Sequence, residues 1–186
     1  MAGRVDIQGQ GEIPKNGACN TTTQWKVTLQ FSGGLILDYR GLPIPNNYDY
    51  GHVVDPEFQA RYGRTNTHGT AFEGADGWVQ VDRQALHTHP AGLLKEKSDD
   101  FKVRLPISTH HVRNFLECVQ SRQPAVSPIE DAVQADLLCH LSDLATRLPR
   151  KLTFDFQTER FLDDDEANQR LQLRQMRQPW TLVSSS

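Results

Sequence analysis

The segment 24–31 constrains the fold most, because its residues alternate between apolar and polar without a break. It reads Gln-Trp-Lys-Val-Thr-Leu-Gln-Phe, which puts Trp25, Val27, Leu29 and Phe31 on one side. Successive side chains of a β-strand point to opposite faces of its sheet. The segment is therefore predicted to be a strand with one buried and one solvated face, as is common in antiparallel sheets.

Turn residues next to apolar runs predict further antiparallel strands. Ser32-Gly33-Gly34 follows the strand at 24–31 and predicts a hairpin over 24–40. Gly74-Ala75-Asp76-Gly77 supplies the glycines of a tight turn and predicts a second hairpin over 67–83. Outside these hairpins, strands are expected at 4–10 and 152–156.

The two faces of the second hairpin differ in character. Val79 and Val81 share one face, and Trp78 and Gln80 share the other. We expect the valines to face the helices of the domain. A large aromatic side chain on the remaining face favours a partner surface, so Trp78 and Gln80 are candidates for an oligomer interface.

Two main helices are predicted in the second half of the chain. Residues 109–122 carry apolar side chains at i, i+3, i+4 and i+7, with Ser108 or Thr109 as the expected N-cap. Residues 128–148 begin with a capping box and a proline in the first turn. Both helices are expected to pack on one face of an antiparallel sheet of about five to seven strands, which makes the fold class α+β.

Three further segments complete the predicted organisation, a single domain over 1–186. Residues 41–66 lack periodicity and are rich in proline and tyrosine, so a long surface loop is expected there. A short helix is expected from Asp163 to about Leu173. Residues 174–186 are predicted to form an extended tail that Trp180 anchors.

Composition excludes several classes of protein. A net charge of −3 gives no electrostatic reason to expect nucleic acid or an anionic membrane as a partner. No apolar run reaches the length of a membrane-spanning helix, and Met1–Asp6 has no apolar signal core. Three cysteines without a CxxC pair indicate a reducing compartment and small buried thiols. We therefore expect a cytoplasmic protein, although an export signal upstream of this sequence would change that expectation.

Several short motifs suggest chemistry, and each also has a simpler structural interpretation. Gly9-x-Gly11 fails as a dinucleotide-binding fingerprint, because Pro14 replaces the third glycine and no helix follows. His87 and His89 could bind a metal but lack further ligands at a suitable spacing, so no metal site is predicted. The pair Asp136 and His140 fits a hydrogen-bonded pair on a helix surface. The acidic run 163–165 fits a helix N-terminus without an ion.

The start of the first main helix carries the candidate substrate-binding residues. His110, His111 and Arg113 could line a cleft, and capping or surface roles remain the alternative. No residue in the chain is assigned a catalytic role.

An ordered series of segments resembles the Gfo/Idh/MocA family, that is, the glucose–fructose oxidoreductase and inositol dehydrogenase family. The resemblance covers most of the chain outside 41–66. The segments that carry it are Gly9–Glu12, Thr21–Phe31, Phe72–Arg83, His111–Arg122, Leu138–Leu141, Arg150–Leu152, Asp164–Asn168 and Pro179-Trp180.

This resemblance implies an NAD(P)-dependent oxidoreductase acting on sugars or cyclitols, built from an N-terminal Rossmann domain and a C-terminal α/β domain. This chain looks like the C-terminal domain without its Rossmann domain. The resemblance implies that the chain binds no cofactor and is inactive alone, and that it forms homo-oligomers through its sheet. Asp136 and His140 imitate the spacing of the family's catalytic pair but lie downstream of the sheet, so that role is not transferred.

Two other classes of function remain open. A carbohydrate-binding or oligomerisation module could use Tyr39, Tyr48, Tyr50 and Tyr62 in or beside the 41–66 loop. A metal-dependent hydrolase could use His87, His89 and the late acidic residues.

Overall fold

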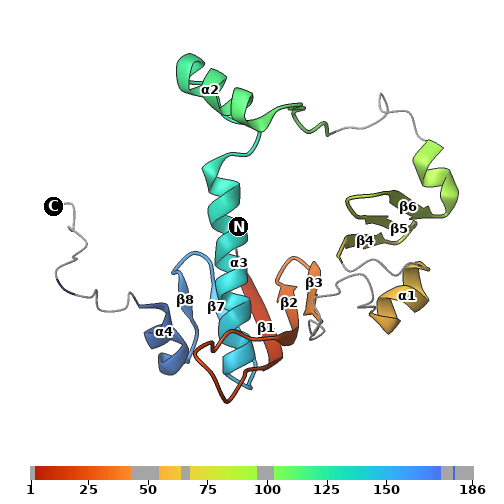
Figure 1. Ribbon diagram of the computed structural model, residues 1–186. Helices are drawn as coiled ribbons and strands as arrows, with labels where there is room; N and C mark the ends of the chain where they lie inside the picture. Colours follow the sequence, from red (N-terminus) through yellow and green to blue (C-terminus); the bar gives the residue numbers. More distant parts are fainter. Residues whose placement is uncertain (1–2, 43–54, 64–67, 96–102, 173–177, 179–186) are drawn as a thin grey trace. The chain divides into compact units, whose positions relative to one another are not determined.

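A computed structural model describes residues 3–42, 55–63, 68–95, 103–172 and 178 (Figure 1). These residues form two compact units. The first comprises Met1–Gly41 with Gln134–Ser186, and the second is Leu42–Val133. The single domain expected over 1–186 stays a prediction, since each unit is described here by itself.

The first unit is built on a five-stranded antiparallel sheet of order β3-β2-β1-β7-β8. Strands β1 and β2 pair along their whole length, with Val5 opposite Phe31 and Glu12 opposite Gln24. The five strands are β1 (Arg4–Glu12), β2 (Gln24–Phe31), β3 (Ile36–Gly41), β7 (Leu152–Asp155) and β8 (Arg160–Phe161). The first and last parts of the unit therefore meet in the sheet centre, where β1 pairs with β7.

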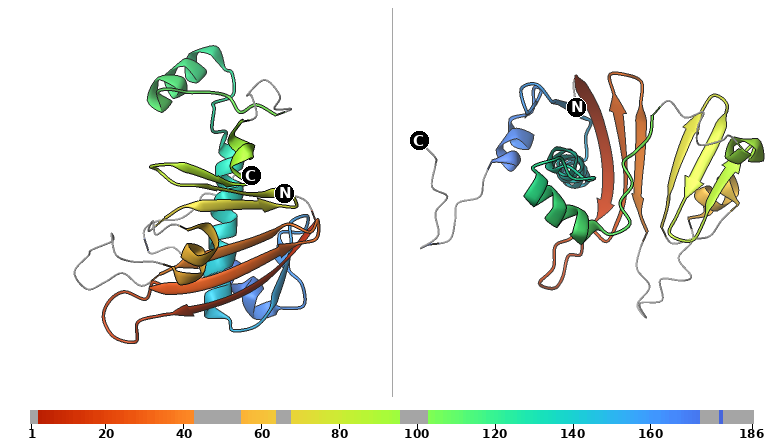
Figure 2. Two further views of the ribbon diagram at one scale, coloured as in Figure 1. Left: turned by 90° about the vertical axis from the view of Figure 1, so that its right-hand side faces the viewer. Right: turned by 90° about the horizontal axis from the view of Figure 1, so that it is seen from above.

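Helix α3 (Ile129–Arg147) covers one face of this sheet, as Figure 2 shows in the view along the helix. Leu141 and Ala145 of the helix are completely buried, as are Val27 and Leu29 of β2. Further buried residues come from the neighbouring strands and from α4 (Asp165–Leu171). The rest of the core consists of Val5, Ile7, Leu148, Leu152, Phe154, Phe161 and Ala167.

Two glycines let α3 lie very close to β1. A Cβ atom built on Gly9 would come within 2.9 Å of the Ala145 Cβ and within 2.8 Å of its carbonyl carbon. A Cβ on Gly11 would lie 2.5 Å from Thr22 Cγ2 and 2.9 Å from Thr146 Cβ. The Gly9-x-Gly11 motif is thus a packing feature within a strand.

The short helix α4 is attached by a network of charged side chains. The Arg150 guanidinium binds both Asp164 carboxylate oxygens, each at 2.9 Å, and reaches Glu166 at 2.8 Å. Asp164 also caps the helix by accepting a hydrogen bond from the Ala167 N–H. These bonds, above all the one from Arg150, lower the pKa of the Asp164 carboxyl. The expected role of the acidic run at a helix start is confirmed.

The second unit contains a three-stranded antiparallel sheet of order β4-β5-β6. Its strands are β4 (Thr70–Gly74), β5 (Gly77–Val81) and β6 (Leu86–His89). The 3₁₀ helix η2 (Ala91–Lys95) follows β6. The predicted hairpin over 67–83 is confirmed, with Gly74 opposite Gly77 at the turn.

Helix α1 (Pro56–Tyr62) lies within the segment that was expected to be a loop, so that expectation is wrong there. Asp55 caps it by accepting the Phe58 N–H at 3.0 Å, and Pro56 occupies its first turn. These are ordinary helix-start signals, but seven residues are too few to show a helical period. The rest of the expected loop, 43–54 and 64–66, lies outside the described residues.

Helix α1 packs on the face of β4 and β5 that carries Trp78. The Tyr62 ring meets the Trp78 ring edge-on, with centroids 5.1 Å apart, and the Tyr62 hydroxyl donates a hydrogen bond to Glu73. The valines were expected to face the two main helices, 109–122 and 128–148, and that expectation stays a prediction. The sequence pattern separated the two faces but did not show which one a short helix would cover.

Helix α2 (His111–Ser121) forms near its predicted position and contains no buried residue. Its apolar side chains are largely exposed, with Phe115 at 61%. Its packing against a sheet face stays a prediction, because α2 and the five-stranded sheet belong to different units. The α+β class, with antiparallel sheets, is confirmed. The expected tail at 174–186, Trp180 included, lies outside the described residues except for position 178.

We predict that Gly9→Ala destabilises the protein by about 1–3 kcal/mol, because the added methyl group must displace the α3 backbone at Ala145. The measurement is the free energy of unfolding from urea denaturation. Gly33→Ala is the matched control, since a Cβ atom there meets nothing within 4 Å. Equal losses for both variants would contradict the close-packing role of Gly9.

Candidate functional site

The N-terminus of α2 brings the three candidate substrate-binding residues together. His110 is the N-cap of the helix, and its Nδ1 atom accepts a hydrogen bond from the Arg113 N–H at 3.3 Å. The expected caps, Ser108 and Thr109, do not take this role. An Nδ1 atom that accepts a hydrogen bond carries no proton, so the neutral His110 ring has its proton on Nε2.

His111 occupies the first helical position beside this cap. The rings of His110 and His111 have centroids 6.2 Å apart and an interplanar angle of 31°. Both histidines and Arg113 are exposed, and the first turn of α2 contains no acidic residue. The site thus offers hydrogen-bond donors and a positive charge at a helix N-terminus, where oxygen atoms of a ligand are favoured. Substrate binding by these residues stays a prediction.

The segment that follows α2 folds back onto the helix through two contacts. Asn114 Oδ1 accepts the Val126 N–H at 3.1 Å, and the Cys118 thiol donates to the Pro124 carbonyl at 3.5 Å. Arg122 ends the helix in the left-handed conformation, with φ 60°. Sequence reasoning missed Asn114, because a side chain that holds a distant loop leaves no periodic signal.

The two interface candidates on β5 lie in different environments. Gln80 is completely buried, so its side chain offers no surface to a partner. Trp78 is half-buried between Tyr62 and His89, whose ring stacks on the indole at 6.0 Å. An interface role for Trp78 stays a prediction, and Gln80 does not fit that role in this structure.

The remaining candidates are structural in character. His87 and His89 lie on β6, opposite Gln80 and Trp78. Asp136 and His140 form the expected surface pair on α3, with Oδ2 and Nε2 3.4 Å apart. Among the described residues, no group of three or more His, Cys, Asp or Glu side chains could hold a metal ion.

All three cysteines are free, but their expected burial is wrong. Cys19 and Cys139 are exposed, and Cys118 is half-buried. Free cysteines are often buried because their side chains are small and apolar. The three cysteines of this chain do not follow that tendency. No helix in the described part of the chain is long and apolar enough to cross a membrane.

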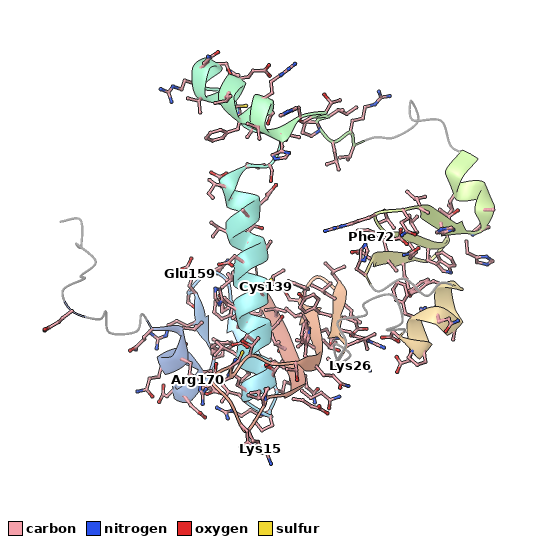
Figure 3. The ribbon with its side chains drawn as sticks, in the orientation of Figure 1. Lys15, Lys26, Phe72, Cys139, Glu159 and Arg170 are labelled. Atoms are coloured by element: carbon pink, nitrogen blue, oxygen red, sulfur yellow. The ribbon has the colours of Figure 1, made fainter. Side chains whose placement is uncertain are left out.

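The uncovered face of the five-stranded sheet is polar. Asp6 accepts a hydrogen bond from Thr153 and an ion pair from Lys151, both at 2.7 Å. The Lys151 contact is the main cause of a lowered pKa for the Asp6 carboxyl. Thr28 donates to Asp38 at 2.6 Å on the neighbouring strands. Figure 3 shows Lys26 of β2, which shares this face.

Residues 97–182 match the model of a protein family described as the oxidoreductase family, C-terminal alpha/beta domain. This region, just under half of the chain, is therefore similar to a C-terminal domain of the Gfo/Idh/MocA oxidoreductase family. Comparisons with curated proteins and with solved structures found no match.

The matched residues include the candidate site at the start of α2. The matched segment spans α2, α3, β7, β8 and α4, and strands β1–β3 precede it in the chain. Because β7 pairs with β1, the matched segment and the N-terminal hairpin contribute to one sheet. The recognition made from the sequence is confirmed at the level of this domain.

We predict that His110→Ala destabilises the first turn of α2 by about 0.5–2 kcal/mol, because a cap acceptor is lost. The measurement is hydrogen exchange at the Arg113 and Asn114 amides. His110→Asp should keep these amides protected, since aspartate is a strong N-cap. His111→Ala is the control that leaves the cap in place, and equal exchange in both alanine variants would contradict the capping role.

Proposed function

We propose that this chain is the substrate-side and assembly part of an NAD(P)-dependent oxidoreductase that acts on sugars or cyclitols. The observation that carries the proposal is the match of residues 97–182 to the C-terminal domain of an oxidoreductase family. On this view a separate Rossmann domain binds the dinucleotide, and this chain does not transfer hydride alone.

The residues of the chain do not fit a dinucleotide. A phosphate-binding loop needs glycines at a strand-to-helix turn, so that backbone N–H groups can approach the pyrophosphate. Gly9 and Gly11 instead lie within β1, opposite Val27 and Trp25. Ala145 of α3 fills the space beside Gly9. The described residues contain no glycine-rich turn from a strand into a helix, which supports the same view.

The donors at the start of α2 suit the substrate side of such an enzyme. Sugars and cyclitols present hydroxyl oxygens that accept hydrogen bonds. His110 Nε2, His111 and the Arg113 guanidinium can each donate one, and none of them is buried. In this proposal the three side chains bind and orient the substrate, and the first turn of α2 places no acidic residue beside them.

The uncovered sheet face supports the assembly part of the proposal. The exposed residues on this face include Gln8, Lys26 and Gln30. Their polar side chains can form hydrogen bonds across an interface. The carbohydrate-binding alternative loses one of its tyrosines, because Tyr62 packs on Trp78 and bonds to Glu73. Tyr48 and Tyr50 lie outside the described residues.

We predict that the chain shows no saturable binding of NAD⁺ or NADP⁺ in isothermal titration calorimetry, because it lacks a phosphate-binding loop in its described part. A Rossmann-fold dehydrogenase measured under the same conditions is the positive control. Saturable binding in the micromolar range would refute the assignment of the dinucleotide to a separate domain.

Assembly through the uncovered sheet face predicts a dimer or larger oligomer by size-exclusion chromatography with light scattering. Gln8→Glu should shift the protein towards monomer, because a two-fold contact would bring like charges together. Gln169→Glu adds the same charge on α4 and should leave the assembly unchanged. A monomeric unmodified chain, or equal effects of both variants, would sink this part of the proposal.

A further inference from the structure

The first unit contains a hollow between α3 and the edge of the sheet formed by β2 and β3. It encloses about 190 Å³ and opens to solvent. Figure 3 marks its position by Cys139 on α3. The residues that line it are Thr21, Thr22, Trp25, Val27, Tyr39, Cys139, Ser142, Asp143 and Thr146.

The hollow is a consequence of how α3 lies on the sheet. Gly9 and Gly11 bring the helix tightly against β1. The residues of α3 that line the hollow recur at i, i+3, i+4 and i+7, from Cys139 to Thr146, and so form one stripe. This stripe lines the hollow together with Trp25 and Val27 of β2 and Tyr39 of β3.

An aromatic pair forms the sheet side of the hollow. The rings of Trp25 and Tyr39 lie 6.1 Å apart at an interplanar angle of 45°. Gly41 accommodates the indole, because a Cβ atom there would lie 2.3 Å from Trp25. The Trp25 Nε1–H is buried and has no hydrogen-bond partner among the described residues. Because this atom exposes almost no surface, Trp25 contributes its apolar ring to the hollow and not its N–H group.

The helix side of the hollow carries hydroxyl groups with free acceptor capacity. Thr146 donates its proton to the Asp143 carbonyl at 2.7 Å, so Thr22 must be the donor in the 3.3 Å contact between the two threonines. Ser142 donates to the Leu138 carbonyl at 2.7 Å. These hydroxyl oxygens can therefore accept hydrogen bonds from a ligand.

The hollow does not select a charged ligand. Asp143 is the one ionisable carboxylate in its lining, and Arg147 pairs with it at 2.8 Å. A cavity of about 150 Å³ is enough to hold a benzene ring in another protein. The volume here therefore suits a single six-membered ring, whose apolar face would cover the aromatic pair.

We propose that this hollow binds one uncharged, hydroxylated six-membered ring, such as a monosaccharide or a cyclitol. The C–H face of the ring lies on Trp25 and Tyr39, and ring hydroxyls donate to Thr22 and Ser142. The inference rests on the proposed function for this class of compound and deepens it by adding a binding site that is separate from the start of α2.

Protection of Cys139 from a thiol reagent tests the proposal. The Cys19 thiol must first be removed, since hydrogen bonds from the Thr21 hydroxyl and backbone lower its pKa and raise its reactivity. The measurement uses the full chain with Cys19→Ser and Cys118→Ser and follows the reaction of Cys139 with a chromogenic disulfide. We expect myo-inositol or D-glucose to slow this reaction several-fold and saturably, with half-effect in the millimolar range.

Two variants locate the ligand. Tyr39→Ala removes half of the aromatic wall and should abolish the protection. Leu37→Ala lies on the same strand and face but outside the hollow, and should retain it. Circular dichroism checks that both variants fold.

Each other outcome overturns the proposal. Unchanged labelling with both polyols excludes the site, and protection by p-cresol alone assigns the hollow to apolar rings. Equal protection in both variants places the ligand elsewhere. No nucleotide is present in this assay, so a negative result rejects the ligand site alone. The proposed function is rejected by a different result, saturable binding of NAD⁺ or NADP⁺ to the chain.

Discussion

The contact between α3 and β1 determines most of the first unit. Gly9 and Gly11 remove the two side chains that would hold the helix away from the sheet, and Ala145 keeps the helix surface small at the same point. The helix can therefore bury Leu141 and Ala145 in one core cluster with residues of β1, β2 and β7. Because β1 comes from the start of the chain and α3 from its second half, this contact joins segments more than a hundred residues apart.

The same contact divides the sheet into three environments. The region under α3 is dry and closely packed, the opposite face carries hydrogen-bonded polar pairs such as Asp6–Thr153, and the edge at β2 and β3 is only partly covered. A helix that sits tightly on the sheet centre cannot also cover its edge, since α3 is a straight element of limited width. The hollow and the polar face are thus two results of one packing choice.

The sequence predicted elements where a period or a cap is long enough to read. The alternation in β2 and the capping box of α3 gave both elements within about two residues of their bounds. Helix α1 and strand β8 were missed, because seven and two residues are too short for a period to appear. The contact of Trp78 with α1 was not predicted, since alternation separates two faces without showing which face a helix covers. His110 was named as a candidate site residue, and its capping role depends on backbone angles that composition does not reveal.

The chemistry open to the chain follows from what its glycines do. In a phosphate-binding loop, glycines leave the strand and turn their N–H groups towards one point, at the start of a helix. Here Gly9 and Gly11 stay in an extended strand, and the space above them belongs to α3. Moving them into a loop would break the β1–β2 register and expose Ala145 and its neighbours in the core. The fold therefore uses these two glycines to bring α3 onto β1, and their backbone N–H groups stay in the strand.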